Sequence, residues 1–400
     1  MGERGGEKMA AGRIVLLKGA HGNLDIFGAG LKRGFERIGY EVFEFDSSDM
    51  VRALGGLHGF VKEPVDAAIG FNNLGLNMEL VEGESIWESL RIPFVDILVD
   101  HPAWYMDALD RAPARTAVLT IDRKHMDYVS RYFPNINICG FLPHGGTESA
   151  AGVLPMVDRR MGVLYAGGNA DAFREEAAPD FSVYDFDCEA VADDALALMI
   201  SSPDTVLEEA LPVVLGRHGV SFDANAIKQL CRDLGYLESL AASHYRNIIL
   251  KSLAESGVDI TLAGAGWDIC PWVSLPNVDY LGKVSAPEVL DLMGRSKIVL
   301  NTMTWFKDGA HERVFNGMLN GAAVVTDSTE YLRETFANPP FEMFDLSDCG
   351  RVVDIVCGLL SDGARLQEIS RAGRNAAAAH TWEKRAEEIA ADLIPALGAR

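Results

Sequence analysis

Cysteine is scarce and scattered in this sequence. No two cysteines have the Cys-x-x-Cys spacing, and the six lie at Cys139, Cys188, Cys231, Cys270, Cys349 and Cys357. Closely spaced pairs are what a zinc ribbon or a small disulfide framework requires. The sequence therefore predicts neither, and isolated thiols of this kind are typical of the reducing cytoplasm, where we expect the protein to be.

Basic residues are fewer than acidic ones, and the sequence has no long apolar run. Lys and Arg number 36 against 58 Asp and Glu, which gives a net charge of −22. That charge repels phosphodiester backbones and anionic lipid surfaces, so we expect no nucleic-acid partner and no membrane-surface partner. No stretch approaches the roughly 20 apolar residues of a membrane span. Residues 1–12 lack the apolar core of a signal peptide and predict a disordered leader.

What is present is the composition of a two-domain α/β protein. A chain of 400 residues with 48% hydrophobic residues is long enough for two separate cores. Short apolar strands alternate with helical patterns in both halves. The pattern predicts one domain over residues 13–150 and a second over 151–380, with a helical insertion at about 171–245. Residues 381–400 predict a C-terminal helix that packs back on the first domain.

The central stretch of the chain is NTMTWFKDGAHERVFNGMLNGAAVVTD, residues 301–327. A strand at Lys297–Leu300 precedes a polar loop, a short helix with an apolar face, and a second strand at Ala322–Thr326. The first N–H groups of a helix lack intrahelical partners, and its dipole favours negative charge there. In parallel sheets, ligands bind at the C-terminal ends of the strands, where this loop falls. The stretch therefore predicts an anion site, with a nucleotide diphosphate as the expected occupant.

Two further segments predict side chains in the same cleft. A buried strand at Ile92–Val99 ends in Asp100-His101-Pro102, and we expect both polar side chains to face the cleft. A glycine-rich turn, Lys18–Gly30, lacks the Gly-x-Gly-x-x-Gly spacing of a dinucleotide site. The pair Asp185 and Asp187 has the Asp-x-Asp spacing of some metal sites. It lies in the predicted insertion, and we assign no metal to it.

The central stretch resembles the donor-site segment of CgeB-type (spore-maturation-protein-like) glycosyltransferases of the GT-B fold. The resemblance extends over most of residues 90–385, and the matching residues are Leu300-Asn301, Gly309, His311-Glu312-Arg313-Val314-Phe315, Gly321-Ala322 and Val324-Val325. It implies two Rossmann-like domains that face each other across a cleft. It departs from related retaining enzymes at two positions, where Asp308 and Asn316 stand in place of a pair of glutamates that contact the sugar and the ribose.

The resemblance also implies roles for individual residues. Asp100, His101 and Asp308 are the expected catalytic group. The expected donor-binding residues are Gly168, Gly266, Trp267, Lys283, Gly309, His311, Glu312, Arg313 and Asn316. On the acceptor side, the first loop contributes His21 and Asn23. Trp267 equally fits a role in core packing, and His21 equally fits an exposed loop residue.

The expected function is transfer of a sugar from a nucleotide-diphospho-sugar to a soluble acceptor, a protein or a small molecule. The resemblance favours retention of configuration, with no metal and no cofactor beyond the donor itself. Asp100 is the expected general base if the reaction inverts instead. Two alternatives remain open: a nucleotide-sugar epimerase of the same fold, and a protein that binds a nucleotide-sugar without transferring it, as the Asp308/Asn316 pair suggests.

Overall fold

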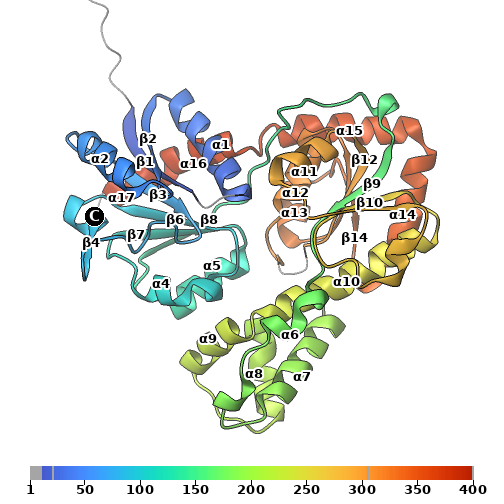
Figure 1. The fold of residues 1–400 in the computed structure, drawn as a ribbon, viewed down its shortest axis with the longest axis horizontal. Coiled ribbons are helices and arrows are strands. Elements are labelled where there is room, and N and C mark those ends of the chain that lie inside the picture. Colours follow the sequence, from blue (N-terminus) through green and yellow to red (C-terminus); the bar gives the residue numbers. More distant parts are fainter. Residues whose placement is uncertain (1–10, 20–21, 304–305, 399–400) are drawn as a thin grey trace, which may run out of the picture.

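The structure of the protein is a computed structural model that describes residues 11–19, 22–303 and 306–398. Two six-stranded parallel sheets, each with flanking helices, lie side by side, and a lobe of short helices lies below both (Figure 1). The chain has the α/β architecture of two Rossmann-like domains expected from the sequence. None of the described helices is long and apolar enough to cross a membrane.

The first sheet has the strand order β2-β1-β3-β6-β7-β8, with every neighbouring pair parallel. Its strands are β1 (Gly12–Lys18), β2 (Tyr40–Asp46), β3 (Ala67–Phe71), β6 (Phe94–Leu98), β7 (Thr116–Thr120) and β8 (Ile138–Phe141). Helices α1 (Asn23–Arg37), α2 (Met50–Phe60), α3 (Ile86–Leu90), α4 (Met106–Asp110) and α5 (Arg123–Tyr132) connect them, with a small hairpin of β4 (Glu79–Val81) and β5 (Glu84–Ser85). The inner strands β3, β6 and β7 are buried along their whole length, the pattern that a parallel sheet covered on both faces requires, while the edge strands β2 and β8 are partly exposed.

The second sheet repeats the plan with the order β11-β10-β9-β12-β13-β14, again with every neighbouring pair parallel. Its strands are β9 (Met161–Ala166), β10 (Ile260–Ala263), β11 (Val278–Gly282), β12 (Ser296–Asn301), β13 (Ala323–Asp327) and β14 (Glu342–Phe344). The helices are α11 (Ala286–Met293), α12 (Glu312–Leu319), α13 (Glu330–Thr335), α14 (Arg351–Ser361) and α15 (Gly363–Ala377). The central strand–loop–helix–strand unit therefore forms β12, α12 and β13.

Helix α1 begins earlier than the sequence suggested. The glycine-rich segment was expected to form a turn as far as Gly30, but helix begins at Asn23 and includes Gly28 and Gly30. The reason is packing: a Cβ on Gly30 would lie 2.5 Å from the Cβ of Trp382, and one on Gly34 would lie 2.6 Å from that of Ala386. These glycines let another helix approach α1 closely, so they do not mark a loop.

That other helix is α16 (Trp382–Glu388), which continues through a π-helical turn at Ile389–Leu393 into α17 (Ile394–Gly398). It follows the second sheet in the chain but lies across α1 of the first domain (Figure 1). Trp382 is fully buried and stacks on Phe27, with ring centroids 4.8 Å apart. The chain therefore crosses back to its first domain at the C-terminus.

The lobe consists of α6 (Arg174–Ala177), α7 (Cys188–Ser201), α8 (Leu207–Arg217) and α9 (Ala224–Asp233). The sequence predicted that the helical insertion ends at about residue 245, but α10 (Tyr236–Glu255) is one continuous helix that runs from the lobe to the second domain (Figure 1). Buried residues of the lobe share one hydrophobic core with buried residues of the first domain. Lys124 of α5 also pairs with Glu209 of α8 at 2.6 Å. The lobe is thus inserted in the second domain but packs on the first.

Asp96 is a buried carboxyl in the middle of β6. It has no exposed surface, and Asn73 N donates to its Oδ1 at 2.9 Å. Within the described part of the chain its Oδ2 has no hydrogen-bond partner. Burial therefore raises the pKa of Asp96 to about 7 from 3.8.

We expect Asp96→Asn to raise the melting temperature near neutral pH and to change it little at about pH 4. As the pH rises from about 4 to 7, the unfolded chain releases this proton while the native protein keeps it, so the native state loses stability. The amide cannot ionise and escapes that loss. Thermal unfolding of both proteins across this pH range measures the difference. A variant equally destabilised at both ends would contradict the assignment.

Candidate functional site

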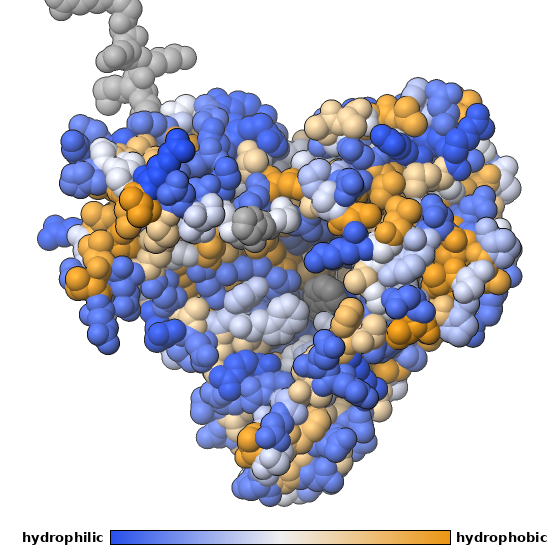
Figure 2. All heavy atoms as spheres, in the orientation of Figure 1, coloured by the Kyte–Doolittle hydropathy of each residue, from blue (hydrophilic) through white to orange (hydrophobic). Residues whose placement is uncertain are grey.

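A cavity of about 500 Å³ lies between the two domains. It is formed where strands of both sheets end, by residues that follow β3 and β6 on one side and β9 and β10 on the other. Figure 2 shows a notch between the domains at the upper edge of a mostly hydrophilic face. The volume falls in the range of small-molecule sites, and strand ends are where parallel sheets bind ligands.

The first domain contributes Asp100 to the cavity wall. Its Oδ2 accepts hydrogen bonds from Asn72 Nδ2 at 2.8 Å and from the Tyr105 hydroxyl at 3.1 Å. Burial raises the pKa of Asp100, and the negative charge of Glu312 across the cavity raises it further. The two carboxyl groups, one from each domain, therefore face the same enclosed space.

The second domain contributes the first turn of α12. Glu312 Oε2 contacts His311 Nδ1, and Arg313 Nη2 lies 2.9 Å from His311 Nε2. Since a guanidinium only donates, Nε2 is an acceptor, and Nδ1 lies between Glu312 Oε2 and the backbone N–H of Arg313, which donates to it at 3.3 Å. Arg313 Nη1 also donates to Asn301 Oδ1 at 2.9 Å, which fixes the guanidinium at the end of β12. The loop motif is thus a network of hydrogen bonds centred on a neutral imidazole.

Charge in this network is set by burial and by Arg313. Burial, with the nearby guanidinium, lowers the pKa of His311 to about 4, so the imidazole is neutral at physiological pH. Burial opposes ionisation of Glu312, but contact with His311 and the charge of Arg313 hold its pKa well below the usual range. The N-terminus of α12 therefore already carries a carboxylate, which also complements the helix dipole.

His144 is a cavity residue that the sequence analysis did not assign to the site. It follows β8, at the end of the first domain, and is 98% buried among the rings of Phe27, Phe306 and Trp382. Burial lowers its pKa to about 3. The signal was available, because Leu142-Pro143-His144 directly follows a strand of the sheet that presents Asp100.

Other predicted residues also line the cavity. Asn23 lies at the start of α1, and Lys283 follows β11. Asn316 of α12 lines the wall as well, and its Oδ1 accepts a hydrogen bond from Thr147 N at 2.7 Å. Of the predicted site residues, the structure therefore brings together Asn23, Asp100, Lys283, His311, Glu312, Arg313 and Asn316.

Asp308 and Gly309 lie outside the cavity lining. Asp308 N donates to Asp122 Oδ2 at 2.8 Å, and its carboxylate lies 3.4 Å from Arg123 Nη1. Gly309 pairs with Asp122 in an antiparallel bridge, and a Cβ there would lie 2.3 Å from Ile121 O. The loop before α12 thus docks on the first domain, and the acid that it presents to the cavity is Glu312. The structure therefore does not place Asp308 in the cavity wall where a contact with the sugar was expected, and that contact stays a prediction.

Trp267, Gly168 and Gly266 also lie outside the lining. Trp267 is fully buried, and its indole N–H donates to Gly167 O at 2.8 Å, so it packs in the core. Gly167 and Gly264 line the cavity in place of the two predicted glycines. His21 falls outside the residues that the structure describes.

His101 was expected beside Asp100 in the cleft but points elsewhere. Consecutive residues of an extended segment face opposite sides, and His101 lies on the side of the helical lobe, where it is 97% buried. There it meets Glu208 and Glu238. Among the described residues, this is the group with the spacing of metal ligands, and it is separate from the cavity lining.

Comparisons with known proteins agree with this architecture. A family described as glycosyl transferase-like matches residues 246–391, which is less than half of the chain. That segment includes β12, α12 and β13. A search of curated protein sequences finds no match.

Solved structures resemble the whole chain. Sucrose-phosphate synthase from Thermosynechococcus elongatus has a TM-score of 0.56 at 10% identity, over 97% of this chain and 100% of that one. An alpha-glucosyltransferase in complex with UDP and a 13-mer DNA has a TM-score of 0.52 at 11% identity, over 96% of this chain and 99% of that one. Anabaena HepE in complex with UDP and glucose has a TM-score of 0.51 at 12% identity, over 97% of this chain and 100% of that one. The chain therefore has the GT-B fold of glycosyltransferases, and its second domain contains a glycosyl transferase-like segment.

Proposed function

We propose that the protein is a glycosyltransferase that moves a sugar from a nucleotide-diphospho-sugar to an acceptor. The observation that carries the proposal is the cavity between the two domains, which presents Asp100 from one side and Glu312 with Arg313 from the other. The glycosyl transferase-like segment supplies the second wall. Similar folds have been solved with UDP, with UDP and glucose, or with UDP and a DNA acceptor.

The donor is proposed to lie along the second domain. Arg313 and Lys283 are the cations that line the cavity, and they are placed to neutralise charge on the leaving diphosphate. Asn316 already accepts from Thr147 N through Oδ1, so its Nδ2 is the group proposed to donate to a ribose hydroxyl.

The transferred sugar is proposed to lie between the two carboxyl groups. An oxocarbenium-like transition state builds positive charge, and carboxylates in an enclosed site stabilise that charge strongly. His144 and His311, both neutral at physiological pH, offer hydrogen bonds without adding competing charge.

The finer assignments follow the CgeB-type resemblance. We propose a retaining, cytoplasmic enzyme whose acceptor is a soluble protein or small molecule. In a retaining reaction the leaving phosphate takes the acceptor proton, so the cleft needs no separate base, and we propose no metal because Arg313 and Lys283 supply positive charge to the diphosphate. The net charge of −22 disfavours a nucleic-acid acceptor.

A thermal-shift screen of the purified protein tests the proposal. UDP, GDP, ADP, CMP, dTDP and their common sugar conjugates are added separately. A ligand of the native state at 100 times its dissociation constant stabilises by about 2.7 kcal/mol, so one nucleotide is expected to raise the melting temperature clearly. A flat panel would remove the basis for a nucleotide-sugar enzyme.

Turnover of the stabilising donor then separates three activities. A transferase releases the nucleotide slowly in water alone, by hydrolysis to free sugar, and faster with an acceptor, to which the sugar is then joined. An epimerase converts the donor to an isomeric nucleotide-sugar without releasing the nucleotide. A binding protein leaves the donor unchanged. Mass spectrometry and sugar chromatography of the mixture distinguish these results, and only the first supports transfer.

A further inference from the structure

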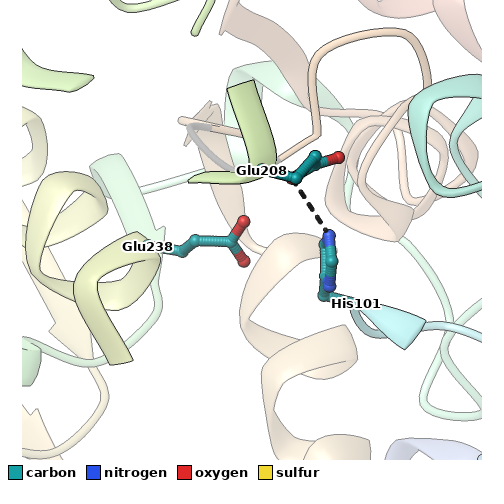
Figure 3. A group of neighbouring side chains, drawn as sticks. All are labelled: His101, Glu208 and Glu238. Atoms are coloured by element: carbon teal, nitrogen blue, oxygen red, sulfur yellow. Dashed lines mark ion pairs between the residues drawn. The ribbon is translucent and has the colours of Figure 1, made fainter. Parts of the chain in front are cut away.

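A buried polar cluster lies where the helical lobe meets the first domain. His101 comes from the segment after β6, Glu208 from α8 and Glu238 from α10. Figure 3 shows the three side chains converging on one point, with an ion pair between His101 and Glu208. Those two groups are 3.6 Å apart, and one ligand atom from each of the three residues lies within 4.8 Å of the others.

The cluster is buried, and several of its polar atoms have no hydrogen-bond partner among the described residues. The three residues are 3%, 8% and 4% exposed in the order His101, Glu208 and Glu238. Within the described part of the chain, His101 Nε2 and one oxygen of each glutamate have no hydrogen-bond partner. Buried carboxylates without donors cost folding free energy, so two of them side by side call for a positive partner.

The side chains packed around His101 provide few hydrogen bonds to the cluster. The rings of His125 and Tyr128 each lie 4.7 Å from the His101 ring, centroid to centroid. Both nitrogens of His125 and the Tyr128 hydroxyl also have no hydrogen-bond partner among the described residues. Lys307 contributes positive charge near Glu238, while its Nζ donates to Pro203 O. One imidazole and two carboxylates therefore face each other with unused ligand atoms.

We propose that His101, Glu208 and Glu238 bind a divalent transition-metal ion, Zn²⁺ or Mn²⁺, that ties the helical lobe to the first domain. Imidazole and carboxylate are ligands of both ions. With zinc–ligand bonds of about 2.0–2.2 Å, two ligand atoms lie at most about 4.4 Å apart, so binding draws the three side chains together from separations of up to 4.8 Å. The role is structural, because His101 faces away from the cavity that Asp100 lines. The metal-free transfer proposed for the cleft is unaffected.

The tautomer of His101 gives the proposal a distinct signature. Ala103 N donates to His101 Nδ1 at 3.1 Å and Nε2 faces Glu208, so a ring proton sits on Nε2 before metal binds. Coordination through Nε2 moves that proton to Nδ1, and the bond from Ala103 N–H is given up. A cluster that merely shares a proton keeps the Nε2–H form.

Metal content of the full-length protein is the first test. The chain is stripped with EDTA, incubated with Zn²⁺ or Mn²⁺, desalted and measured by elemental mass spectrometry. The wild type is expected to keep one ion per chain, with a higher melting temperature than the stripped protein. Glu208→Gln and Glu238→Gln are each expected to lose the ion. A wild type that retains no metal, or variants that retain as much as the wild type, would overturn the proposal.

Glu209→Gln is the matched control, because Glu209 is adjacent on α8 but pairs with Lys124 at the surface of the same interface. It is expected to keep the ion. The cluster variants remove a buried charge while preserving shape, so in metal-free buffer their melting temperatures are expected to match or exceed the wild type.

A second measurement follows the protonation of the histidine rings in the wild-type protein. In protein labelled with ¹⁵N-histidine, long-range ¹H–¹⁵N correlations report which ring nitrogen carries the proton. Addition of Zn²⁺ is expected to convert one histidine from the Nε2–H to the Nδ1–H form, with His101→Asn identifying the signal. No change in any histidine tautomer would contradict coordination.

Discussion

Asp100→Asn is expected to slow sugar transfer by about 10²–10³-fold, while the nucleotide alone binds with unchanged affinity. The amide keeps an oxygen for the donors of Asn72 and Tyr105, so the wall of the cavity stays in place. What is lost is the negative charge opposite Glu312. A charge that matters most in the transition state changes kcat more than it changes the binding of a non-reacting nucleotide.

The pH dependence of transfer sharpens this prediction. Since burial and Glu312 raise the pKa of Asp100, the wild-type rate is expected to fall on the acidic side at a higher pH than an ordinary aspartate would give. The Asp100→Asn variant is expected to lack this fall in rate at acidic pH, because the amide does not titrate. Asp127→Asn, an exposed change on α5, serves as the control and is expected to transfer at the wild-type rate. If Asp100→Asn transferred at the wild-type rate, Asp100 would have no part in the chemistry.

Trp382→Ala is expected to lower the free energy of unfolding by about 3–5 kcal/mol, the usual cost of removing a buried aromatic side chain. The indole stacks on Phe27 and meets the edge of Phe71, with centroids 5.3 Å apart in the second contact. Its removal leaves a void beneath α1, because Gly30, which faces Trp382, has no side chain to fill it. Chemical denaturation followed by circular dichroism measures the loss.

Trp104→Ala provides the matched control for this change. Trp104 is 40% exposed, so the same truncation removes much less buried surface, and its cost is expected to be clearly smaller. Phe27 and His144 line the cavity and both contact Trp382. Under conditions in which the Trp382→Ala variant is folded, it is therefore also expected to bind the donor more weakly than the wild type. Equal losses for the two tryptophans would show that α16 does not anchor the first domain.

The sheets were predictable from the sequence because a strand buried on both faces is a short apolar run, which local patterning reveals. The start of α1 could not be predicted from the sequence. Its glycines look like a loop until one knows that another helix, some 350 residues further on, lies against them. The predicted end of the insertion at about residue 245 falls inside helix α10, because the residues of α10 face the lobe at one end and the second sheet at the other, so its apolar positions follow no single stripe.

The site was predictable only in part, for related reasons. Cavity residues on α12 follow from the strand–loop–helix pattern, and Asp100 follows from its place after β6. Asp308 was misplaced because the loop docks on the other domain, and that contact leaves no local pattern. His101 was misplaced although alternation along an extended segment already separates it from Asp100.

The threading of the chain between domains also constrains how it is made. All strands of the first sheet have been synthesised by residue 141, yet their surface is covered by lobe residues that come later and by Trp382 near the end. At the usual 5–20 residues per second, the wait from the last strand to that tryptophan is roughly 10–50 s. During this interval the nascent first domain exposes apolar surface, which makes it a natural client for chaperones.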